Sequence, residues 1–449
     1  EEPWMKWSEE WLDNFKIRLS AGSMGNGNVD PYSYTSEMTV ATASDIVLGG
    51  GLPSYTTVGS TVPVSLTWEK STTYDVGLDL DFFNNRLSVS GDYYRRYTTD
   101  MYTPSISLPS VYGTTSPKGN NAELRTTGWE LSLTWRDSFK LGGKPFDYSI
   151  KAMVWDNRTV VTKYENATRS LGTLKGYIQN GGSPSDFYEG MELGEMWGYT
   201  VAGLFRDQAD IDSSATHDFT QASDKVTRPG QVKIADLDHN GNIDPGAFTA
   251  DDHGDLSIIG NINPHYMFGV NLAANWNGIG LSVFLQGVMK RDWYPSPDSG
   301  YFWGKYARPF MWVLGIHNYT DDMYSKEKNN WDTAYWPRMT TYQSNSSYSW
   351  TKLLEIPNTR YKQNAAYLRV KNIQVDYTFP KALCQKIRLG GLKIYLSGEN
   401  LFTFTPLHKY APNFDPEALG YDTDFSSTAG DGYTYPVLKS VTLGVNITF

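Results

Sequence analysis

The chain has 449 residues, 14% of them aromatic, and its 39 basic and 49 acidic side chains leave a formal net charge of -10 at pH 7. This negative balance argues against a nucleic acid as partner, because phosphates select basic surfaces. No run of about 18 apolar residues occurs, which excludes membrane-spanning helices. The single cysteine, Cys384, excludes an intramolecular disulfide bond.

Alternating apolar and polar side chains predict β-strands in the first third of the chain, since successive side chains of a strand point to opposite faces. Residues 72–82 read TTYDVGLDLDF, and residues 86–98 continue the pattern after an Asn84-Asn85 turn. Residues 14–24 and 33–43 are further candidates for the same sheet. The clear runs reach the roughly 9 to 11 residues that a transmembrane β-strand needs.

Two more strands are predicted over 123–136, which contains GWELSLTWR, and 145–156. One alternating run, GEMWGYTVAGLF at 194–205, lies between them and the next predicted strand at 264–276. If strands cross a membrane in alternate directions, the ascending 145–156 and the descending 264–276 leave no place for a single extra span. We therefore expect residues 194–205 not to cross.

A loop within this stretch carries a candidate metal site. Its spacing follows the start of an EF-hand calcium loop, in which alternate oxygen ligands surround a hard cation. The twelfth position is Ala247 instead of a bidentate glutamate, and Asp251, Asp252 or Asp255 are candidates to replace it. The alternative is a turn that binds no metal. Ca²⁺ is the only cofactor suggested, with the candidate ligands Asp236, Asp238, Asn240, Asn242 and Asp244.

Alternation resumes in HYMFGVNLAANW, residues 265–276, which enters an Asn277-Gly278 turn and leaves through 280–290. The loop that follows, 291–365, is rich in aromatic residues, and aromatic rings can stack on the apolar faces of sugars. The alternative is that these residues pack the loop or contact another protein. The candidate ligand contacts are Tyr301, Trp303, Tyr306 and Trp312.

The last predicted strands are 366–379, 391–403 and the C-terminal decapeptide SVTLGVNITF. A free edge on such a strand would promote aggregation, so the pattern favours a barrel, with a soluble β-sandwich as the alternative. We expect one face of the strands to meet lipid and the other to line a lumen. The residues expected to face lipid are Tyr74, Val76, Leu78, Leu80, Leu131, Leu133, Val270, Leu272, Leu443, Val445 and Ile447.

The connections are unequal in length, which gives the chain an orientation. Outer-membrane barrels have short periplasmic turns and long extracellular loops. Three connections are short, at 84–85, 277–278 and 380–390. The long ones are 157–195, 205–263, 291–365 and 404–436.

No catalytic set can be assembled from the sequence. It contains no HExxH, GxSxG or phosphate-loop motif. An outer-membrane hydrolase would need a nucleophile beside a base, and no motif supplies one. We therefore do not expect an enzyme.

Several stretches occur in the order found in one known family. They include WSEEWLDNFKIRLSAGSMGNGN, NNRLSVSGDYYRRYTTDMY, LGEMWGYTVAGLF, GQVKIADLDHNGNID, DDHGDLSIIGNINPHYMFGVNL and AAYLRVKNIQVDYTFP. The chain thereby resembles the C-terminal part of the SusC-like TonB-dependent transporters of the Bacteroidetes outer membrane. Its last strand also resembles the C-terminal signal that directs bacterial outer-membrane barrels to their assembly machinery, at Thr442, Gly444, Ile447 and Phe449.

The resemblance implies an all-β fold, part of a 22-stranded antiparallel transmembrane barrel with long extracellular loops. It also implies a plug, energy from TonB and a SusD-like surface lipoprotein that covers the opening. The cargo of the family is oligosaccharide or, in some members, peptide. These implications place the protein in the bilayer of the bacterial outer membrane.

The chain departs from the family in length, because about ten to twelve strands are predicted where the family has 22. No plug and no TonB box are recognisable in it. We therefore expect residues 1–449 to form the C-terminal portion of the barrel and to need an N-terminal barrel-and-plug portion as partner. The alternative function is a barrel that displays loops for binding or adhesion without transport.

Overall fold

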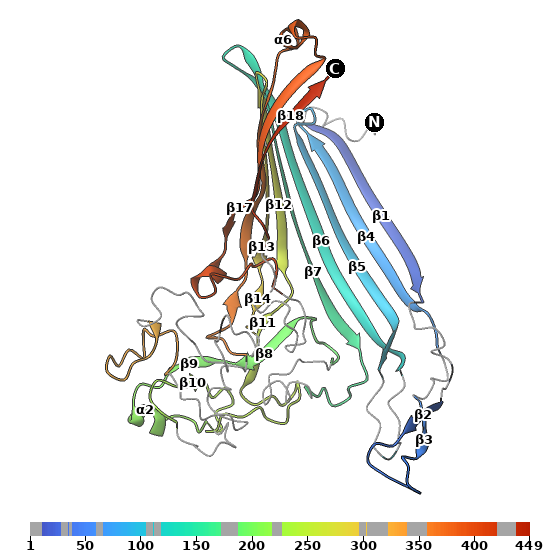
Figure 1. The fold of residues 1–449 in the computed structure, drawn as a ribbon, viewed down its shortest axis with the longest axis vertical. Helices are drawn as coiled ribbons and strands as arrows, with labels where there is room; N and C mark the ends of the chain where they lie inside the picture. The colour runs from blue at the N-terminus through green and yellow to red at the C-terminus, as the bar shows by residue number, and fades with distance from the viewer. Residues whose placement is uncertain are drawn as a thin grey trace.

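The fold is given by a computed structural model, which describes residues 11–27, 35, 38–59, 66–104, 111, 118–171, 187–217, 227–295, 302, 322–338, 357–419 and 437–449. Ten long strands form one antiparallel sheet (Figure 1). Each of these strands pairs with the one that follows it among the ten, and the shorter strands between them in the sequence lie in the loops. In order across the sheet they are β1 (Leu12–Asn26), β4 (Glu69–Phe82), β5 (Leu87–Pro104), β6 (Lys118–Leu141), β7 (Lys144–Lys163), β12 (His265–Trp276), β13 (Ile279–Lys290), β16 (Tyr367–Thr378), β17 (Gly391–Phe404) and β18 (Ser440–Thr448).

The remaining elements are short and lie outside this sheet. Four two-stranded pairs are β2 (Met38–Thr42) with β3 (Ser54–Val58), β8 (Glu195–Tyr199) with β11 (Leu256–Asn261), β9 (Val201–Leu204) with β10 (Val232–Ile234), and β14 (Asp292–Trp293) with β15 (Gln363–Asn364). The short helices that lie within the described residues are α2 (Gln208–Asp212), α6 (Lys381–Lys386) and the 3-10 helix η4 (Pro406–Lys409). No helix among the described residues is long and apolar enough to cross a membrane.

The predicted strands are confirmed with one correction. Residues 14–24 belong to β1, which pairs with β4 along its length. The described strand within 33–43, β2, is not part of the large sheet and pairs with β3 in a separate hairpin. The alternating pattern in this segment therefore predicts a strand correctly, but it does not indicate the partner of that strand.

The run at 194–205 does not cross, as predicted. It splits into β8 and β9, which pair with β11 and β10 in the loops. In the sheet itself β7 pairs directly with β12, although more than a hundred residues separate them. The intervening segment therefore forms a loop structure at one end of the sheet.

Cross-strand register places the residues predicted to face lipid on one side of the sheet. Leu133 lies opposite Val89 on β5 and Ala152 on β7, and Ala152 lies opposite Val270 on β12. Many of these side chains are exposed on the surface of the sheet; Leu443, for example, is 73% exposed. In the described part of the chain no second sheet packs on this side, which agrees with a lipid-facing surface and not with a sandwich.

Aromatic side chains form two belts on the apolar face, as expected at the two interfaces of a membrane. Near the short turns, Trp135 Nε1 donates to the Tyr148 hydroxyl at 3.1 Å, and Phe139 packs on Phe146 with ring centroids 5.0 Å apart. Trp276 lies opposite Phe146 on the next strand. Near the loops the second belt contains Tyr74, Tyr93, Tyr97 and Trp129.

The opposite face of the sheet is polar. Arg18 Nε lies 2.8 Å from the Asp79 carboxylate, and Arg18 Nη1 lies 2.8 Å from that of Asp92. Ser90 Oγ donates to Asp79 at 2.6 Å. The aspartates of β4 therefore line a charged, hydrogen-bonded wall, which is the predicted lumen surface.

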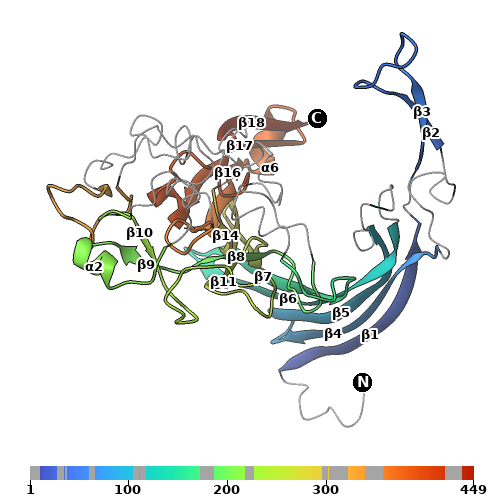
Figure 2. The same ribbon diagram turned by 90° about the horizontal axis from the view of Figure 1, so that it is seen from below.

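The sheet is curved but open. Its strand order runs from β1 to β18, and no pairing between these two edges joins the described residues into a closed barrel (Figure 2). All short turns lie at one end together with α6 and the C-terminus, and the loop elements lie at the other (Figure 1). The tight turns form as predicted, because Asn84, Asn85 and Asn277 adopt φ of 57°, 60° and 47°.

Candidate functional site

The loops after β7, β13 and β17 pack together at one end of the sheet into what we call the loop cap. Its described residues are 187–217, 227–262, 292–295, 302, 322–338, 357–365 and 405–419. The side chains of Tyr199, Phe302, Trp336 and Tyr361 have no exposed surface. Because each buried aromatic removes about 150 to 250 Å² from water, the cap has a hydrophobic core of its own.

Ring stacking orders the centre of the loop cap. Trp336 stacks on Tyr361 with centroids 5.6 Å apart, and Tyr335 stacks on Tyr410 at 3.5 Å. Tyr335, Trp336 and Tyr361 come from the loop between β13 and β16, and Tyr410 comes from the loop after β17, so the stacking of Tyr335 on Tyr410 joins two segments far apart in the sequence. Burial raises the pKa of Tyr361 and of Tyr335, which keeps both phenols neutral over the physiological range.

A buried ionic cluster anchors one loop of the cap to the sheet. We call it the Arg369 latch: Arg369 of β16 pairs with both Asp415 and Glu417, and Lys371 Nζ lies 2.6 Å from the Glu417 carboxylate. Arg291 adds to the anchoring, because its guanidinium donates to the carbonyl oxygens of Pro416 and Leu419 at 2.8 and 2.7 Å.

The electrostatics of the latch favour ionised carboxylates. Burial opposes ionisation of Asp415, yet the backbone N–H of Glu417 and the Arg369 guanidinium together hold the pKa of this carboxyl below its usual value. The Arg369 side chain is only 4% exposed. Sequence reasoning did not identify this cluster, although an arginine on the polar side of a predicted strand and the acidic DPE triplet were both visible.

A buried histidine joins the sheet to the segment before β8. His265 Nδ1 lies 2.8 Å from Asp156 Oδ1 of β7, and its Nε2 lies 3.6 Å from Glu192 Oε1. Asn261 also donates to Glu192, at 3.3 Å. These contacts fix the position of the segment before β8, where the chain enters the loop cap. No sequence motif predicted them.

The predicted metal loop folds so that three carboxylates converge. Ligand oxygens of Asp236, Asp238 and Asp255 all lie within 4.8 Å of one another. Asp255 is completely buried and accepts hydrogen bonds from the backbone N–H groups of Leu237 at 2.6 Å and Asp244 at 2.9 Å. Of the three candidates to replace a twelfth ligand, the fold therefore brings Asp255 into the cluster.

Charge accumulates at this cluster without a compensating cation among the described residues. Burial raises the pKa of Asp255, although the hydrogen bonds from its two backbone N–H donors lower it. The negative charges of Asp238 and Asp236 raise the pKa further. Asp236 Oδ1 is a buried oxygen without a hydrogen-bond partner. A carboxylate oxygen in this position is suited to a hard cation.

The other predicted ligands lie nearby but are engaged within the loop. Asn240 Nδ2 donates to Asp238 at 2.9 Å and to Asp244 at 3.2 Å, and the Asn242 N–H donates to the Asn240 side-chain oxygen at 2.7 Å. Asp251 pairs with Arg169 at 2.5 Å and stays outside the cluster. The loop is thus an ordered Asx-rich turn whether or not an ion binds.

The aromatic candidates Tyr301, Trp303, Tyr306 and Trp312 lie outside the described residues. Their neighbour Phe302 is described, and it is buried against Trp293 and Trp336 in the core of the loop cap. The assignment of the four residues to ligand contact stays a prediction.

The predicted assembly signal lies on the edge strand β18. Thr442 and Gly444 face the polar side, where the Tyr395 ring lies directly over Gly444, and Ile447 faces the apolar side opposite Leu392. Phe449 follows the last paired residue and is 94% exposed. These positions are compatible with a recognised terminus, and the role of the signal stays a prediction.

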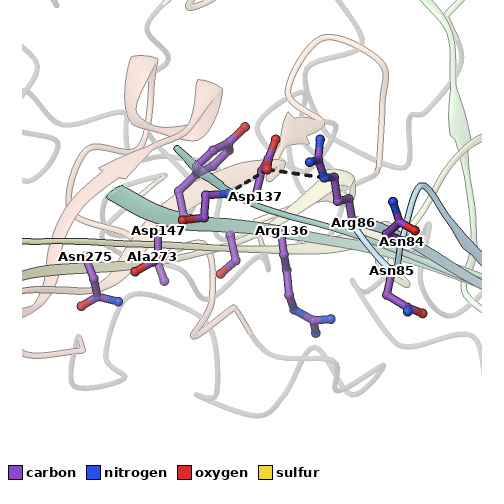
Figure 3. A pocket seen from close by; sticks show the side chains of 11 residues that line it. Asn84, Asn85, Arg86, Arg136, Asp137, Asp147, Ala273 and Asn275 are labelled. Atoms are coloured by element: carbon purple, nitrogen blue, oxygen red, sulfur yellow. Dashed lines mark hydrogen bonds and ion pairs between the residues drawn. The ribbon is translucent and has the colours of Figure 1, made fainter. Parts of the chain in front are cut away.

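A shallow pocket of about 550 Å³ lies at the other end of the sheet, among the short turns (Figure 3). Arg86 Nε pairs with Asp137 at 3.6 Å on one side of the strands, while Arg136 and Asn275 point to the opposite side. Its lining is polar and contains none of the predicted site residues. The described residues therefore concentrate their candidate chemistry in the loop cap.

Residues 7–401 match the family described as TonB dependent receptor-like, beta-barrel. The chain is 26% identical to TonB-dependent receptor P3 of Formosa agariphila, over 98% of the chain and 40% of that protein. It is 23% identical to TonB-dependent receptor SusC of Bacteroides thetaiotaomicron, over 98% of the chain and 38% of that protein.

Among solved structures, the chain resembles the RagAB peptide transporter with a TM-score of 0.64 and 21% sequence identity, over 98% of this chain and 41% of that one. The chain thus spans 38–41% of the length of these relatives. The similarity to the solved structure supports the same fold. Together with the family match over most of its length, this shows that the chain belongs to the TonB-dependent receptor-like β-barrel family.

Proposed function

We propose that this chain is the C-terminal portion of the wall of an outer-membrane importer of the SusC-like type. The observation that carries the proposal is the open ten-stranded sheet with one apolar face, one polar face and a folded loop cap at a single end. A sheet with two free edges in lipid would leave backbone groups without partners. The importer therefore needs further strands to close the barrel.

The proposal includes three partners. An N-terminal barrel-and-plug portion closes and seals the wall, TonB supplies energy through that portion, and a SusD-like surface lipoprotein covers the loop cap. Family membership and the relative named SusC support this assignment. The family is one of receptors and transporters and not of enzymes, so we propose no catalytic activity.

The cargo is a nutrient too large for passive diffusion, either an oligosaccharide or a peptide. The solved relative is titled a peptide transporter, and this supports the peptide alternative. The aromatic loop with Tyr301, Trp303, Tyr306 and Trp312 supports the sugar alternative, because aromatic rings stack on sugar faces.

Purification tests the assembly. The protein, tagged and extracted from outer membranes in mild detergent, should bring down a barrel-and-plug polypeptide and a lipoprotein in constant ratio. An extraction under denaturing conditions, in which non-covalent partners separate, is the control. A closed, monodisperse barrel built from these 449 residues alone would contradict the proposal.

Uptake distinguishes import from the alternative of display or adhesion. Cells that carry the protein should accumulate labelled oligosaccharide or peptide, and collapse of the proton-motive force should abolish accumulation while leaving surface binding intact. Surface binding without energy-dependent accumulation would favour the display alternative.

We also propose that Ca²⁺ binds at Asp236, Asp238 and Asp255 and stabilises the loop cap. The convergence of three carboxylates and the unpartnered Asp236 oxygen support this second proposal. Asn240, Asn242 and Asp244 would then order the loop around the ion, either directly or through water. A calcium ion here would hold β10 and β11 of the cap together, since the three aspartates lie next to these strands.

A further inference from the structure

Three arginines lie together on the apolar face of the sheet, at the end that carries the loops. Arg95 of β5 lies opposite Thr127 of β6, which lies opposite Arg158 of β7, and Arg125 is two residues along β6. With about 4.8 Å between neighbouring strands, the backbones of Arg95 and Arg158 are about 10 Å apart. All three side chains are exposed, and we call them the arginine cluster.

The depth of the cluster follows from the aromatic belts. Trp129, opposite Tyr93, belongs to the belt near the loops, and Phe139 belongs to the belt near the turns. Ten residues at about 3.4 Å each and a tilt of about 40° give a vertical distance of about 26 Å, close to the apolar band of roughly 25 Å in such barrels. The arginines lie within the belt near the loops, with Arg95 opposite Tyr74 and Arg125 opposite Tyr97, and therefore at the level of lipid headgroups.

The cluster is not neutralised by the protein. No carboxylate among the described residues forms an ion pair with Arg95 or Arg125, and the hydrogen-bond partners of Arg95 are the neutral phenols of Tyr93, at 3.3 Å, and Tyr97. Arg158 reaches Glu192 at 4.0 Å, the limit of an ion pair. The charge stands out in a chain whose net charge is -10.

Neighbouring charges on this face are already paired. Lys70 lies 3.5 Å from Asp100, and Lys163 lies 3.6 Å from Glu123. Asp156 is buried and pairs with His265. The surplus positive charge is therefore confined to the three arginines, whose strands β5, β6 and β7 are neighbours in the sheet (Figure 1).

We propose that the arginine cluster binds a phosphate-bearing lipid headgroup of the surrounding outer leaflet. Guanidinium groups bind phosphate oxygens with two parallel hydrogen bonds, and they keep their charge at an interface. The acyl chains of the same lipid would lie on the apolar residues below, including Val76, Leu131 and Val154. This inference depends on the outward face meeting lipid and not on the cargo or the partners of the importer.

Lipid titration of the intact outer-membrane complex tests the proposal. The complex is delipidated, placed in nanodiscs of zwitterionic lipid and titrated with a phosphate-rich anionic lipid, and bound lipid is counted by native mass spectrometry. Each basic residue near a membrane surface contributes about fivefold in affinity, so the triple variant R95Q/R125Q/R158Q should bind the anionic lipid on the order of a hundredfold more weakly.

Two variants and one ligand serve as controls. R96Q removes an arginine from the adjacent position of β5, which faces the lumen beside Thr73, and should bind anionic lipid like the unmodified complex. The triple lysine variant keeps the charge and should retain intermediate affinity, which separates the loss of binding from misfolding. Inorganic phosphate should not compete with the lipid at millimolar concentration.

Three results would overturn the proposal. Unchanged lipid binding by the triple glutamine variant would show that the cluster is not the site, and an equal loss in R96Q would show a general charge effect. Efficient competition by inorganic phosphate would identify a site for a free anion and not for a lipid headgroup.

Discussion

At the scale of single residues, the acidic loop shows how a partial motif is completed by the fold. The EF-hand-like spacing supplies Asp236 and Asp238, and the chain then returns to place Asp255 beside them, buried and held by two backbone donors. A buried carboxylate next to two others is costly unless a cation or a proton compensates it. The raised pKa of Asp255 expresses this cost.

Calcium should therefore stabilise the loop cap of the unmodified protein, and the substitution Asp236→Asn should remove this stabilisation. At a concentration one hundred times the dissociation constant, a bound ion contributes about 2.7 kcal/mol. Thermal unfolding with calcium and with a chelator measures the effect, and Asp251→Asn, outside the cluster, is the matched control. Equal unfolding temperatures with and without calcium for the unmodified protein would leave the Asx-rich turn as the whole explanation.

At the scale of elements, the loop cap is attached to the sheet by a few buried polar contacts. The Arg369 latch fixes residues 405–419 to β16, and His265 fixes the segment before β8 to β7 and β12. Removal of one partner of a buried ion pair typically lowers the free energy of unfolding by about 3 to 5 kcal/mol, because the remaining charge stays buried without a partner. An exposed pair contributes about 1 kcal/mol or less.

The substitution Arg369→Met should release residues 405–419 from the sheet, with hydrogen exchange of this segment as the measurement. Lys393→Met, which breaks the more exposed pair with Asp376, should leave the segment protected. Protection that is unchanged in Arg369→Met would show that packing of Leu407 and Phe414 holds the loop by itself.

The latch should also depend on pH. The pKa of Asp415 is lowered in the folded protein, so its contribution to stability is complete above the ordinary value of 3.8 and is lost as the pH falls below this value through the lowered pKa. The protection factor of residues 405–419, which is the intrinsic exchange rate divided by the observed rate at the same pH, should therefore fall on acidification below pH 3.8 and stay high at neutral pH. A protection factor that is already lost near neutral pH would point to a different group.

The terminal strand β18 presents a separate test. If Phe449 belongs to an assembly signal, its deletion should lower the amount of folded protein in the outer membrane without changing the activity of assembled molecules. Deletion of an exposed aromatic outside the strand pairing costs little folding energy, so a large loss must come from assembly. Heat-modifiable migration of membrane fractions measures the folded amount, and normal assembly would mean that the terminus is only a strand.

At the scale of the whole molecule, one sheet separates two environments. Leu133 lies on the apolar face near mid-depth, and its neighbour Ser132 lies on the polar face. A charge in lipid at mid-depth costs about 2 to 4 kcal/mol, whereas a charge in a polar lumen is hydrated. The substitution Leu133→Arg should therefore reduce folded protein in the outer membrane, and Ser132→Arg should be tolerated. Equal tolerance of both would show that the apolar face does not meet lipid.

The strands, their two faces and the direction of the chain could all be predicted from the sequence alone. Side-chain alternation has a period of two and is local, so the runs around Leu78, Leu133 and Val270 could be read without a structure. The Asn84-Asn85 and Asn277-Gly278 turns were also local, because asparagine and glycine tolerate positive φ. Loop lengths then showed which end of the sheet carries the large loops.

Contacts between residues far apart in the sequence could be seen only in the folded molecule. Alternation contains no information on pairing partners, so β2 could be assigned to the wall until its hairpin with β3 was seen. The pairing of β7 with β12, the return of Asp255 to Asp236 and the contact of Arg369 with Asp415 all join residues separated by long loops. Such contacts depend on how the loops pack around a common core, and that packing is a property of the whole chain and not of any local pattern.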